Sequence, residues 1–272
     1  MGLHDAPLGK TSDYPDRYDP ELLFPVPRAE NRHRLGLDDG RWPWFGEDLW
    51  QAWEVSWLRP GGVPAVAWAE IRFSAASPAI IESKSLKLYL NSLNQTVFSS
   101  PEQVAETITR DLSSASGSAV HVLMKSVDES AFAVGRPAGY ELLDDEPVAD
   151  VVYEYAPDSL SAGGEKVSEK LCSHLLKSNC PVTGQPDWGT LMISYTGPAI
   201  DRSGLLKYIV SFRQKQDFHE HCVETVFTDL MSRCQPEQLM VCARYTRRGG
   251  LDINPWRSTS PDHDAGPRLI RQ

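Results

Sequence analysis

A cysteine and an aspartate lie seven residues apart in the segment 178–189, which is rich in proline and glycine. Cys180 precedes Pro181 and Asp187 follows Pro186, so proline rings restrict the backbone beside both side chains. Cysteine is strongly nucleophilic near neutral pH even when only partly ionised, and a carboxyl group can serve as its proton partner. The pattern indicates covalent catalysis by Cys180, with a buried structural cysteine as the alternative.

A second segment, residues 82–89, alternates hydroxyl groups with lysines and begins with an acid, Glu82. Lysine charge and serine hydroxyls such as those of Lys84, Lys87 and Ser83 can hold a phosphate. Glu82 can accept hydrogen bonds from the amidine-like edge of a base. A solvated charged face is the alternative interpretation.

A third segment, residues 218–222, joins two histidines, an acid and a thiol, which raises the question of a metal site. The spacing differs from that of H-E-x-x-H, whose histidines are four residues apart on one helical face. His219 and Cys222 are three apart and can share a face, but we favour a His219–Glu220 pair that faces a ligand, and we predict no metal.

A fourth segment, residues 245–250, places Arg247 and Arg248 directly before two glycines. Glycine lets the backbone approach a ligand closely, and arginine binds phosphate through its planar fork. The segment predicts an anion-binding turn, with an ordinary surface turn as the alternative.

The chain as a whole is acidic, with a net charge of −10 over 272 residues. Such a chain repels nucleic acid, so an anionic ligand has to be held by a local basic cluster. Five cysteines without a C-x-x-C pair indicate free thiols in a reducing compartment. The sequence also lacks an apolar leader and a membrane-length apolar run, so we expect a cytoplasmic protein without membrane or direct nucleic-acid partners.

Apolar alternation and turn residues predict the elements that position these segments. In the first half we expect strands at 49–57 and 66–73 around the turn 59–62, a helix near 100–112, and a strand at 120–127. In the second half we expect a strand-like stretch at 144–155, a helix at 165–176, a strand at 191–195, a helix near 217–233 and a strand at 238–245. These bounds place Cys180 on a loop where a helix ends.

The two halves of the chain contain similar segments, 81–92 and 200–211, in which aliphatic, acidic, tyrosine and serine positions recur at a fixed offset. Each copy follows a strand and precedes a helix and another strand. The sequence therefore predicts a duplicated module of order β-β-α-α-β-β, which is too long a repeat for a solenoid. We predict an N-terminal arm at 1–45, a first module at 46–140 and a second module at 141–272.

Taken together, these segments closely resemble the NADPH-dependent 7-cyano-7-deazaguanine reductases. The resemblance extends over about residues 9–257 and rests on residues 18–28, 82–89, 178–187, 218–224 and 247–255. The first of these segments is typical of the family's longer, two-module branch. In the shorter branch one module carries both the lysine motif and the cysteine loop, whereas here they lie in different copies.

The resemblance implies an α+β protein built from tandem tunnelling-fold (T-fold) modules, each an antiparallel sheet with two helices on one face. It also implies a homodimer. The absence of a G-x-G-x-x-G motif does not argue against NADPH, because this fold is not a Rossmann fold.

The resemblance further implies that the nitrile of a deazaguanine is reduced to an amine with two NADPH through a thioimide on Cys180, with Asp187 as proton donor. The implied substrate-binding residues are Ile81, Glu82, Ser83, His219 and Glu220. The implied cofactor-binding residues are Ser83, Lys84, Arg248 and Gly249. The second copy has lost the two lysines and begins Asp201-Arg202-Ser203, so we expect it to be structural.

Two alternatives remain open. One is a zinc-dependent, cyclohydrolase-like enzyme of the same fold that uses Cys180 and His219 as ligands. The other is a non-catalytic module that binds a purine.

Overall fold

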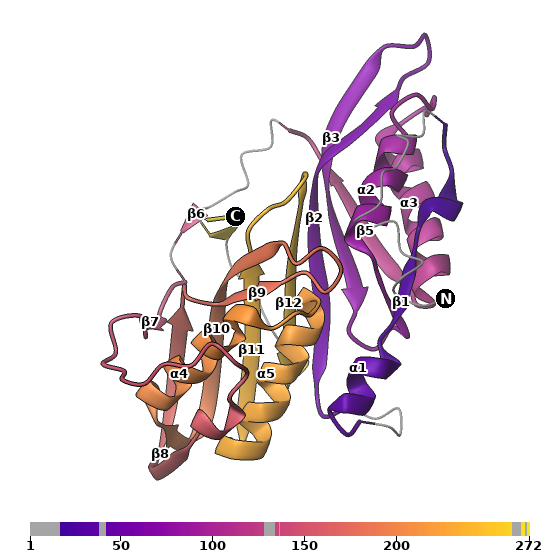
Figure 1. Cartoon of the computed structure of the whole chain (residues 1–272). Helices are drawn as coiled ribbons and strands as arrows, with labels where there is room; N and C mark the ends of the chain where they lie inside the picture. The colour runs from indigo at the N-terminus through magenta and orange to yellow at the C-terminus, as the bar shows by residue number, and fades with distance from the viewer. Residues whose placement is uncertain (1–16, 38–41, 128–133, 136, 263–267, 270) are drawn as a thin grey trace. The chain divides into compact units, whose positions relative to one another are not determined.

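The chain folds into two compact units, each of which is described by itself (Figure 1). The computed structural model describes residues 17–37, 42–127, 134–135, 137–262, 268–269 and 271–272. Unit 1 contains the described residues of Met1–Asp38, Glu47–Ala131 and Arg247–Ile253; unit 2 contains those of Asp39–Gly46, Phe132–Thr246 and Asn254–Gln272. The predicted domains, 1–45, 46–140 and 141–272, are contiguous, whereas these units exchange short segments.

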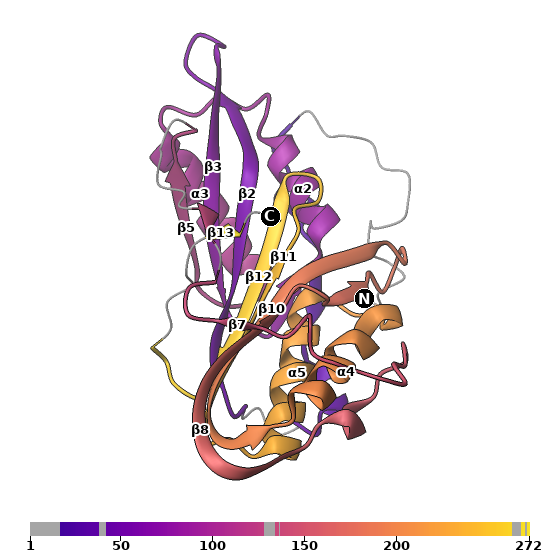
Figure 2. The ribbon, with the colours of Figure 1, turned by 90° about the vertical axis from the view of Figure 1, so that its left-hand side faces the viewer.

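Unit 1 is a mixed α and β structure in which β3 pairs with both β2 and β5 in antiparallel register. Its elements are a 3-10 turn (Pro20–Leu22), β1 (Pro25–Pro27), α1 (Ala29–Arg34), β2 (Phe45–Leu58), β3 (Pro64–Ser74), β4 (Ala79–Ile81), α2 (Ser83–Ser92), α3 (Pro101–Ser116) and β5 (Val120–Lys125). Helices α2 and α3 pack on one face of these strands (Figures 1 and 2). The core between them joins sheet residues such as Trp50 and Ile71 to helix residues such as Leu86 and Ile108.

Unit 2 has the same kind of architecture, with β11 between β10 and β12, and β8 on the other side of β10. Its elements are β6 (Val134–Gly135), β7 (Glu141–Leu142), a 3-10 turn (Pro157–Ser159), β8 (Ala162–Ser173), β9 (Lys177–Asn179), β10 (Pro186–Ile200), α4 (Arg202–Ser211), a 3-10 turn (Phe212–Gln214), α5 (His219–Cys234), β11 (Gln238–Tyr245), β12 (Leu251–Ser258, whose first residues are counted with unit 1) and β13 (Arg268–Leu269). Helices α4 and α5 lie on one face of these strands (Figure 2).

The capping residues that predicted the helix α3 have the expected positions and contacts in the structure. Ser100 caps α3 by accepting a hydrogen bond from the Gln103 N–H, and Pro101 is its first residue. Gly117, in the left-handed region, ends the same helix. The strands predicted at 49–57, 66–73, 120–127, 191–195 and 238–245 and the helices predicted at 100–112 and 217–233 are confirmed, with bounds that differ by a few residues.

The predicted duplication is visible as a repeated order of elements. Helices α2 and α4 both have 10 residues, and α3 and α5 both have 16. An acidic side chain caps the first helix of each pair, Glu82 in unit 1 and Asp201 in unit 2. Strands β2, β3 and β4 precede α2 and α3, and β8, β9 and β10 precede α4 and α5. The predicted order β-β-α-α-β-β therefore holds in outline, but each unit has an additional strand of three residues before its helices.

The helix predicted at 165–176 is wrong, because this stretch is the strand β8. Val167 and Leu171 are four residues apart, a spacing that fits a helix but is also an even number and so fits a strand. Most of β8 pairs with β10 through backbone hydrogen bonds, and this pairing favours the strand over the helix. Cys180 therefore follows a strand, β9, rather than the end of a helix.

The strand-like stretch predicted at 144–155 is also wrong. These residues form turns and irregular chain whose side chains are mostly exposed, and Asp150 has a positive φ of 53°. Its apolar residues Val152 and Tyr153 are adjacent and both exposed, so the stretch offers no apolar face for a sheet.

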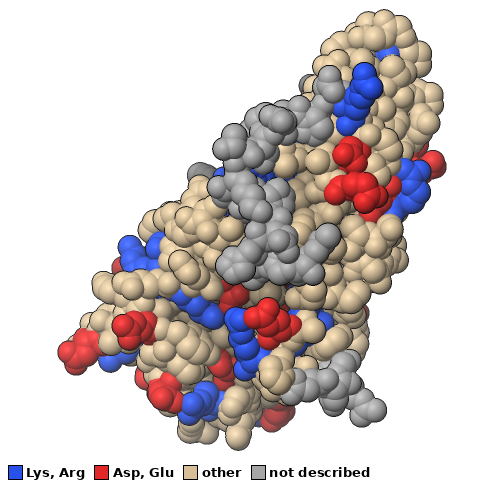
Figure 3. All heavy atoms as spheres, turned by 45° about the vertical axis from the view of Figure 1, so that its right-hand side comes forward, with Lys and Arg blue, Asp and Glu red and all other residues tan. Residues whose placement is uncertain are grey.

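Charges of both signs are interspersed on the face drawn in Figure 3, without a large area of one sign. Unit 2 contains several exposed or partly exposed pairs, for example Lys166 with Glu237 and Arg233 with Asp158. Among the described residues, no helix is long and apolar enough to cross a membrane.

A buried ion pair attaches α5 to β12 within unit 2. Arg257 Nη2 lies 3.0 Å from Glu224 Oε1, and both side chains are fully buried. Since α5 begins at His219, this pair also fixes a helix that carries two predicted site residues.

We predict that Arg257→Met lowers the free energy of unfolding by about 3–5 kcal/mol, because it leaves the Glu224 carboxylate buried without its partner. The double variant Glu224→Leu/Arg257→Met should recover most of this loss, because it removes both charges. Urea denaturation of the three proteins measures the difference. A double variant as unstable as the single one would contradict the explanation.

Candidate functional site

Cys180 begins the connection of a β-hairpin in unit 2. Strand β9 pairs with the start of β10, with Asn179 opposite Pro186 and Ser178 opposite Asp187. The Cys180 N–H donates to the Gln185 carbonyl at 2.9 Å, and the Cys180 carbonyl accepts from the Gly184 N–H at 3.0 Å. Hydrogen bonds to both backbone groups of Cys180 therefore fix the predicted nucleophile, whose side chain is only 4% exposed.

The hairpin register places Cys180 and Asp187 on one face. Asp187 is directly opposite Ser178, and Cys180 follows Ser178 by two residues. Because side chains alternate between the faces of a strand, residues two apart point the same way. The predicted nucleophile and proton donor thus share a face, and Asp187 is buried.

Two backbone hydrogen bonds connect this hairpin to the chain that leads into α5. The Asn179 N–H donates to the Lys215 carbonyl at 2.9 Å, and the Asn179 carbonyl accepts from the Asp217 N–H at 3.0 Å. As a result α5 starts beside the hairpin, with His219 and Glu220 in its first turn.

The His219 imidazole reaches Asp187, with 3.4 Å between Nε2 and Oδ1. Glu220 follows on the same helix and is buried. Unit 2 therefore places His219 beside Asp187, with Cys180 on the same face of the hairpin as Asp187 and Glu220 in the first turn of α5.

Sequence reasoning gave no role to Tyr245, the last residue of β11. Its ring lies edge-on to the His219 imidazole, with ring centroids 4.0 Å apart. A tyrosine directly before the basic turn at 247–250 was the available signal, but the contact depends on the pairing of β10 with β11.

Cys222 lies one helical turn after His219 and is buried. Burial, with a smaller contribution from Asp217, raises the pKa of its thiol to about 12, so it stays protonated at neutral pH. Among the described residues, no group of three or more His, Cys, Asp or Glu side chains is arranged to hold a metal ion.

Glu82, predicted to bind substrate, is buried at the start of α2 in unit 1. Its carboxylate accepts hydrogen bonds from the Lys84 N–H at 2.7 Å and the Ser85 N–H at 2.9 Å. Burial raises the pKa of Glu82, although these bonds and the charge of Lys87 act in the opposite direction. Ile81 ends β4 immediately before it, and Ser83 is the first residue of α2.

The predicted cofactor residues Arg248 and Gly249 lie in a tight hairpin turn of unit 1. The Arg248 and Leu251 backbones exchange hydrogen bonds of 2.9 and 3.1 Å around Gly249 and Gly250. Both glycines have positive φ, 55° and 82°, as a two-residue type I′ turn requires. Lys84, another predicted cofactor-binding residue, lies on α2 in the same unit.

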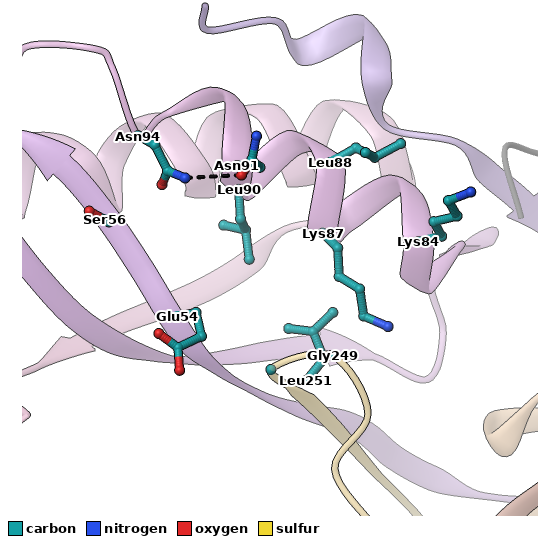
Figure 4. A pocket seen from close by; sticks show the side chains of 11 residues that line it. Glu54, Ser56, Lys84, Lys87, Leu88, Leu90, Asn91, Asn94, Gly249 and Leu251 are labelled. Atoms are coloured by element: carbon teal, nitrogen blue, oxygen red, sulfur yellow. Dashed lines mark hydrogen bonds between the residues drawn. The ribbon is translucent and has the colours of Figure 1, made fainter. Parts of the chain in front are cut away.

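A cavity of about 390 Å³ lies between this turn, α2 and β2 (Figure 4). Lys87 extends from α2 toward the turn, and a Cβ at Gly249 would lie 3.1 Å from its Nζ. Glycine therefore leaves the space that the lysine chain occupies. The wall of the cavity is formed by Glu54, Ser56, Lys84, Lys87, Leu88, Leu90, Asn91, Asn94, Gly249, Gly250 and Leu251. Two lysines and a turn of small residues suit an anionic ligand, and the volume suits part of a dinucleotide.

Each unit contains the backbone arrangement that holds the cysteine loop. In unit 1, Leu58 forms a parallel bridge with Val97, as Asn179 does with Gln216 in unit 2. The residue after the bridge is Arg59 in unit 1 and Cys180 in unit 2. The first residues of the 16-residue helices are likewise Pro101 and His219. The predicted nucleophile and histidine therefore have no counterpart of the same type at the matching positions of unit 1.

In the second copy of the repeated segment, residues 200–211, an arginine at the start of the helix forms ion pairs within unit 2. Arg202, the first residue of α4, contacts Glu141 at 2.5 Å and Glu169 at 2.8 Å. Its guanidinium is thus engaged within unit 2, in agreement with the expectation that this copy is structural.

Comparison with known proteins gives family matches in both halves of the chain. The model described as nitrile reductase, 7-cyano-7-deazaguanine-reductase N-term matches residues 14–124, and the model described as QueF-like protein matches residues 186–264.

Curated relatives match over the full length. A protein of Chromohalobacter salexigens named NADPH-dependent 7-cyano-7-deazaguanine reductase is 55% identical over 99% of this chain and 98% of its own length. A protein of Azoarcus sp. strain BH72 with the same name is 54% identical over 100% of this chain and 97% of its own length. Among solved structures, an archaeosine synthase QueF-Like in the apo form matches with a TM-score of 0.32 and 15% identity, over 38% of this chain and 99% of that chain.

Asp217 links the start of α5 to its neighbours and gives the site a dependence on pH. Its carboxylate accepts from the Phe218 N–H at 3.0 Å and lies 3.1 Å from His221 Nδ1 and 3.0 Å from Lys215 Nζ. Burial alone would raise the pKa of Asp217, but the hydrogen bond and charge of His221, with Lys215, lower it below its usual value.

We predict that Asp217→Asn lowers the free energy of unfolding at pH 7, and that its difference from the parent protein shrinks as the pH falls. A carboxyl group with a depressed folded pKa contributes stability above its unfolded pKa of about 3.9, and this contribution is lost as the pH falls through the folded pKa. Urea denaturation from pH 7 to pH 3 measures this. The exposed pair partner Asp158 provides a control, since Asp158→Asn should cost under about 1 kcal/mol. A difference for Asp217→Asn that does not change with pH would refute the prediction.

Proposed function

This chain belongs to the family of NADPH-dependent 7-cyano-7-deazaguanine reductases, and from that membership we propose that Cys180 and Asp187 carry out its chemistry. The chain reduces the nitrile of 7-cyano-7-deazaguanine to the primary amine, 7-aminomethyl-7-deazaguanine, in the biosynthesis of queuosine. The observation that carries the assignment of residues is the hairpin that holds Cys180 and Asp187 on one face.

A nitrile carbon is electrophilic but accepts hydride poorly, so a covalent intermediate on the enzyme makes the reduction easier. In our proposal the Cys180 thiolate attacks this carbon and a carbon–sulfur bond forms. One π bond of the nitrile breaks, its electron pair moves to nitrogen, and Asp187 supplies the proton. The product of this step is a thioimide on Cys180.

NADPH supplies the hydride for the two successive reductions, the second of which converts an imine to the amine. We propose that Ser83, Lys84, Arg248 and Gly249 bind it. The cavity in unit 1 supports this assignment, because Lys84 and Gly249 both line it and Lys87 adds a second positive charge.

The guanine-like edge of the substrate presents N–H donors, which carboxylates accept. We propose that Glu82 and Glu220 are these acceptors, with Ile81 and Ser83 beside Glu82. Both carboxylates are buried and both lie at the start of a helix, where the helix dipole favours negative charge. His219, 3.4 Å from Asp187, orients the substrate or assists the movement of the proton.

We further propose that each unit is a T-fold module and that the chain acts as a homodimer in the cytoplasm, without direct nucleic-acid or membrane partners. The repeated order of strands, two helices and a following strand supports the T-fold assignment.

We predict that the enzyme forms a covalent adduct with 7-cyano-7-deazaguanine when NADPH is absent. Intact-protein mass spectrometry should show the added mass of the nitrile in the parent protein, and none in Cys180→Ala. Cys172→Ala is the matched control and should still form the adduct, because burial, then Asp144, raises the pKa of the Cys172 thiol to about 11. An adduct on another cysteine, or one that persists in Cys180→Ala, would refute the assignment.

We predict that Lys84→Ala raises KM for NADPH by about tenfold, the size expected when one hydrogen bond to a charged group is lost. Steady-state kinetics at saturating nitrile measure this. Lys207→Ala on α4 removes a lysine from the duplicated helix in unit 2 and should leave KM unchanged. Equal shifts in both variants would show a general charge effect instead of a specific contact.

A further inference from the structure

Tyr245 is a buried residue of unit 2 whose ring contacts His219, a predicted substrate-binding residue. The side chain is 1% exposed, and the ring centroid lies 4.0 Å from that of His219 with an interplanar angle of 64°. Edge-on aromatic contacts of this kind fix the relative orientation of the two rings. The other end of the imidazole reaches Asp187 through Nε2.

The space for this ring is created by a glycine on the neighbouring strand. Gly189 pairs with Tyr245 in the β10–β11 ladder. A Cβ at Gly189 would lie 3.2 Å from Tyr245 Cδ1 and 3.3 Å from the Arg244 carbonyl, closer than most such contacts. Gly189 also follows Asp187 by two residues, so the strand that provides the space for the ring also carries the carboxylate.

Tyr245 contacts His219 through its ring. Burial is the main cause that raises the pKa of Tyr245 well above its usual value, so the phenol stays protonated. Ser178 and Cys222 lie beside the hydroxyl, but it is a buried oxygen without a hydrogen-bond partner among the described residues. Tyr245 therefore acts on His219 through the packing of its ring against the imidazole.

We propose that Tyr245 is a positioning residue that holds the His219 imidazole against Asp187, and that Gly189 is required because a side chain there would displace the ring. The inference rests on the proposed function, in which Asp187 protonates the substrate nitrogen after attack by Cys180. It assigns Tyr245 an effect on turnover and none on the binding of NADPH.

The test compares Tyr245→Leu with Tyr245→Phe. Tyr245→Leu removes the edge-on contact and should lower kcat for nitrile-dependent NADPH oxidation by about ten- to a hundredfold, the loss that follows a misplaced catalytic group. KM for NADPH should not change. Tyr245→Phe keeps the ring and removes an oxygen without a partner, so it should restore kcat close to that of the parent protein.

Loss of a buried ring can also act through stability, and Tyr195→Leu is the matched control. Tyr195 is a buried tyrosine on β10 whose hydroxyl donates to Glu169, a residue that the proposed site does not include. Thermal melting of both leucine variants reports their stability, and kcat is compared at a temperature where both are folded. Tyr195→Leu should then keep the kcat of the parent protein.

Gly189→Ala provides an independent test, because it perturbs the same ring from the opposite strand. It should lower kcat in the parent protein but have little further effect in Tyr245→Leu, which is the non-additivity expected of residues that act through one contact.

Three outcomes would overturn the proposal: kcat falling equally in Tyr245→Leu and Tyr195→Leu, Tyr245→Phe losing as much as Tyr245→Leu, or additive effects of Gly189→Ala and Tyr245→Leu. Failure of the proposed function is distinguishable, because in that case the parent protein itself forms no adduct with the nitrile at Cys180.

Discussion

Two backbone hydrogen bonds at Asn179 are the constraint on which the proposed site of unit 2 depends. They join the hairpin that ends in Cys180 to the chain that enters α5, so that His219 and Asp187 meet across two elements far apart in sequence. The same bridge occurs in unit 1 at Leu58, where no cysteine follows it. The scaffold is therefore a property of the duplicated fold, and the side chains after the bridge decide whether a unit has a nucleophile. Backbone bonds suit this purpose, because substitutions around them leave them intact.

Duplication allowed the two copies to diverge. Unit 1 retains lysines on its first helix and a glycine turn that leaves Lys87 room beside a cavity, while Arg59 stands where unit 2 has Cys180. Unit 2 retains the cysteine hairpin, while Arg202, at the start of its first helix, is held by Glu141 and Glu169. In our proposal the two units therefore supply different parts of the chemistry, cofactor binding in unit 1 and the nucleophile in unit 2. An acidic protein can hold an anionic cofactor in this way, because the positive charge is needed in only one unit.

The sequence predicted most of the architecture where local signals agree with the final fold, as at α3, whose cap, first proline and terminal glycine are all used. It failed at residues 165–176, since a spacing of four between Val167 and Leu171 fits both periods and pairing with β10 decides for a strand. The site residues were predicted by type and by resemblance, and they stay a prediction; of these residues, the structure shows His219 beside Asp187. Tyr245 was missed because its contact with His219 depends on a register, Gly189 opposite Tyr245, that no local pattern encodes.

Burial does not identify the nucleophile, because all five cysteines are free and buried. Burial raises the pKa of Cys172, Cys222, Cys234 and Cys242, which keeps these four as neutral thiols at physiological pH. Cys172 and Cys242 lie inside strands, and Cys222 and Cys234 lie in the helix α5. Cys180 differs in its place on the chain, since it starts a hairpin connection whose backbone is fixed at both its N–H and its carbonyl. A fixed backbone holds a nucleophile in one geometry, and this place at the start of a tight loop is what supports the proposal that Cys180 is the nucleophile.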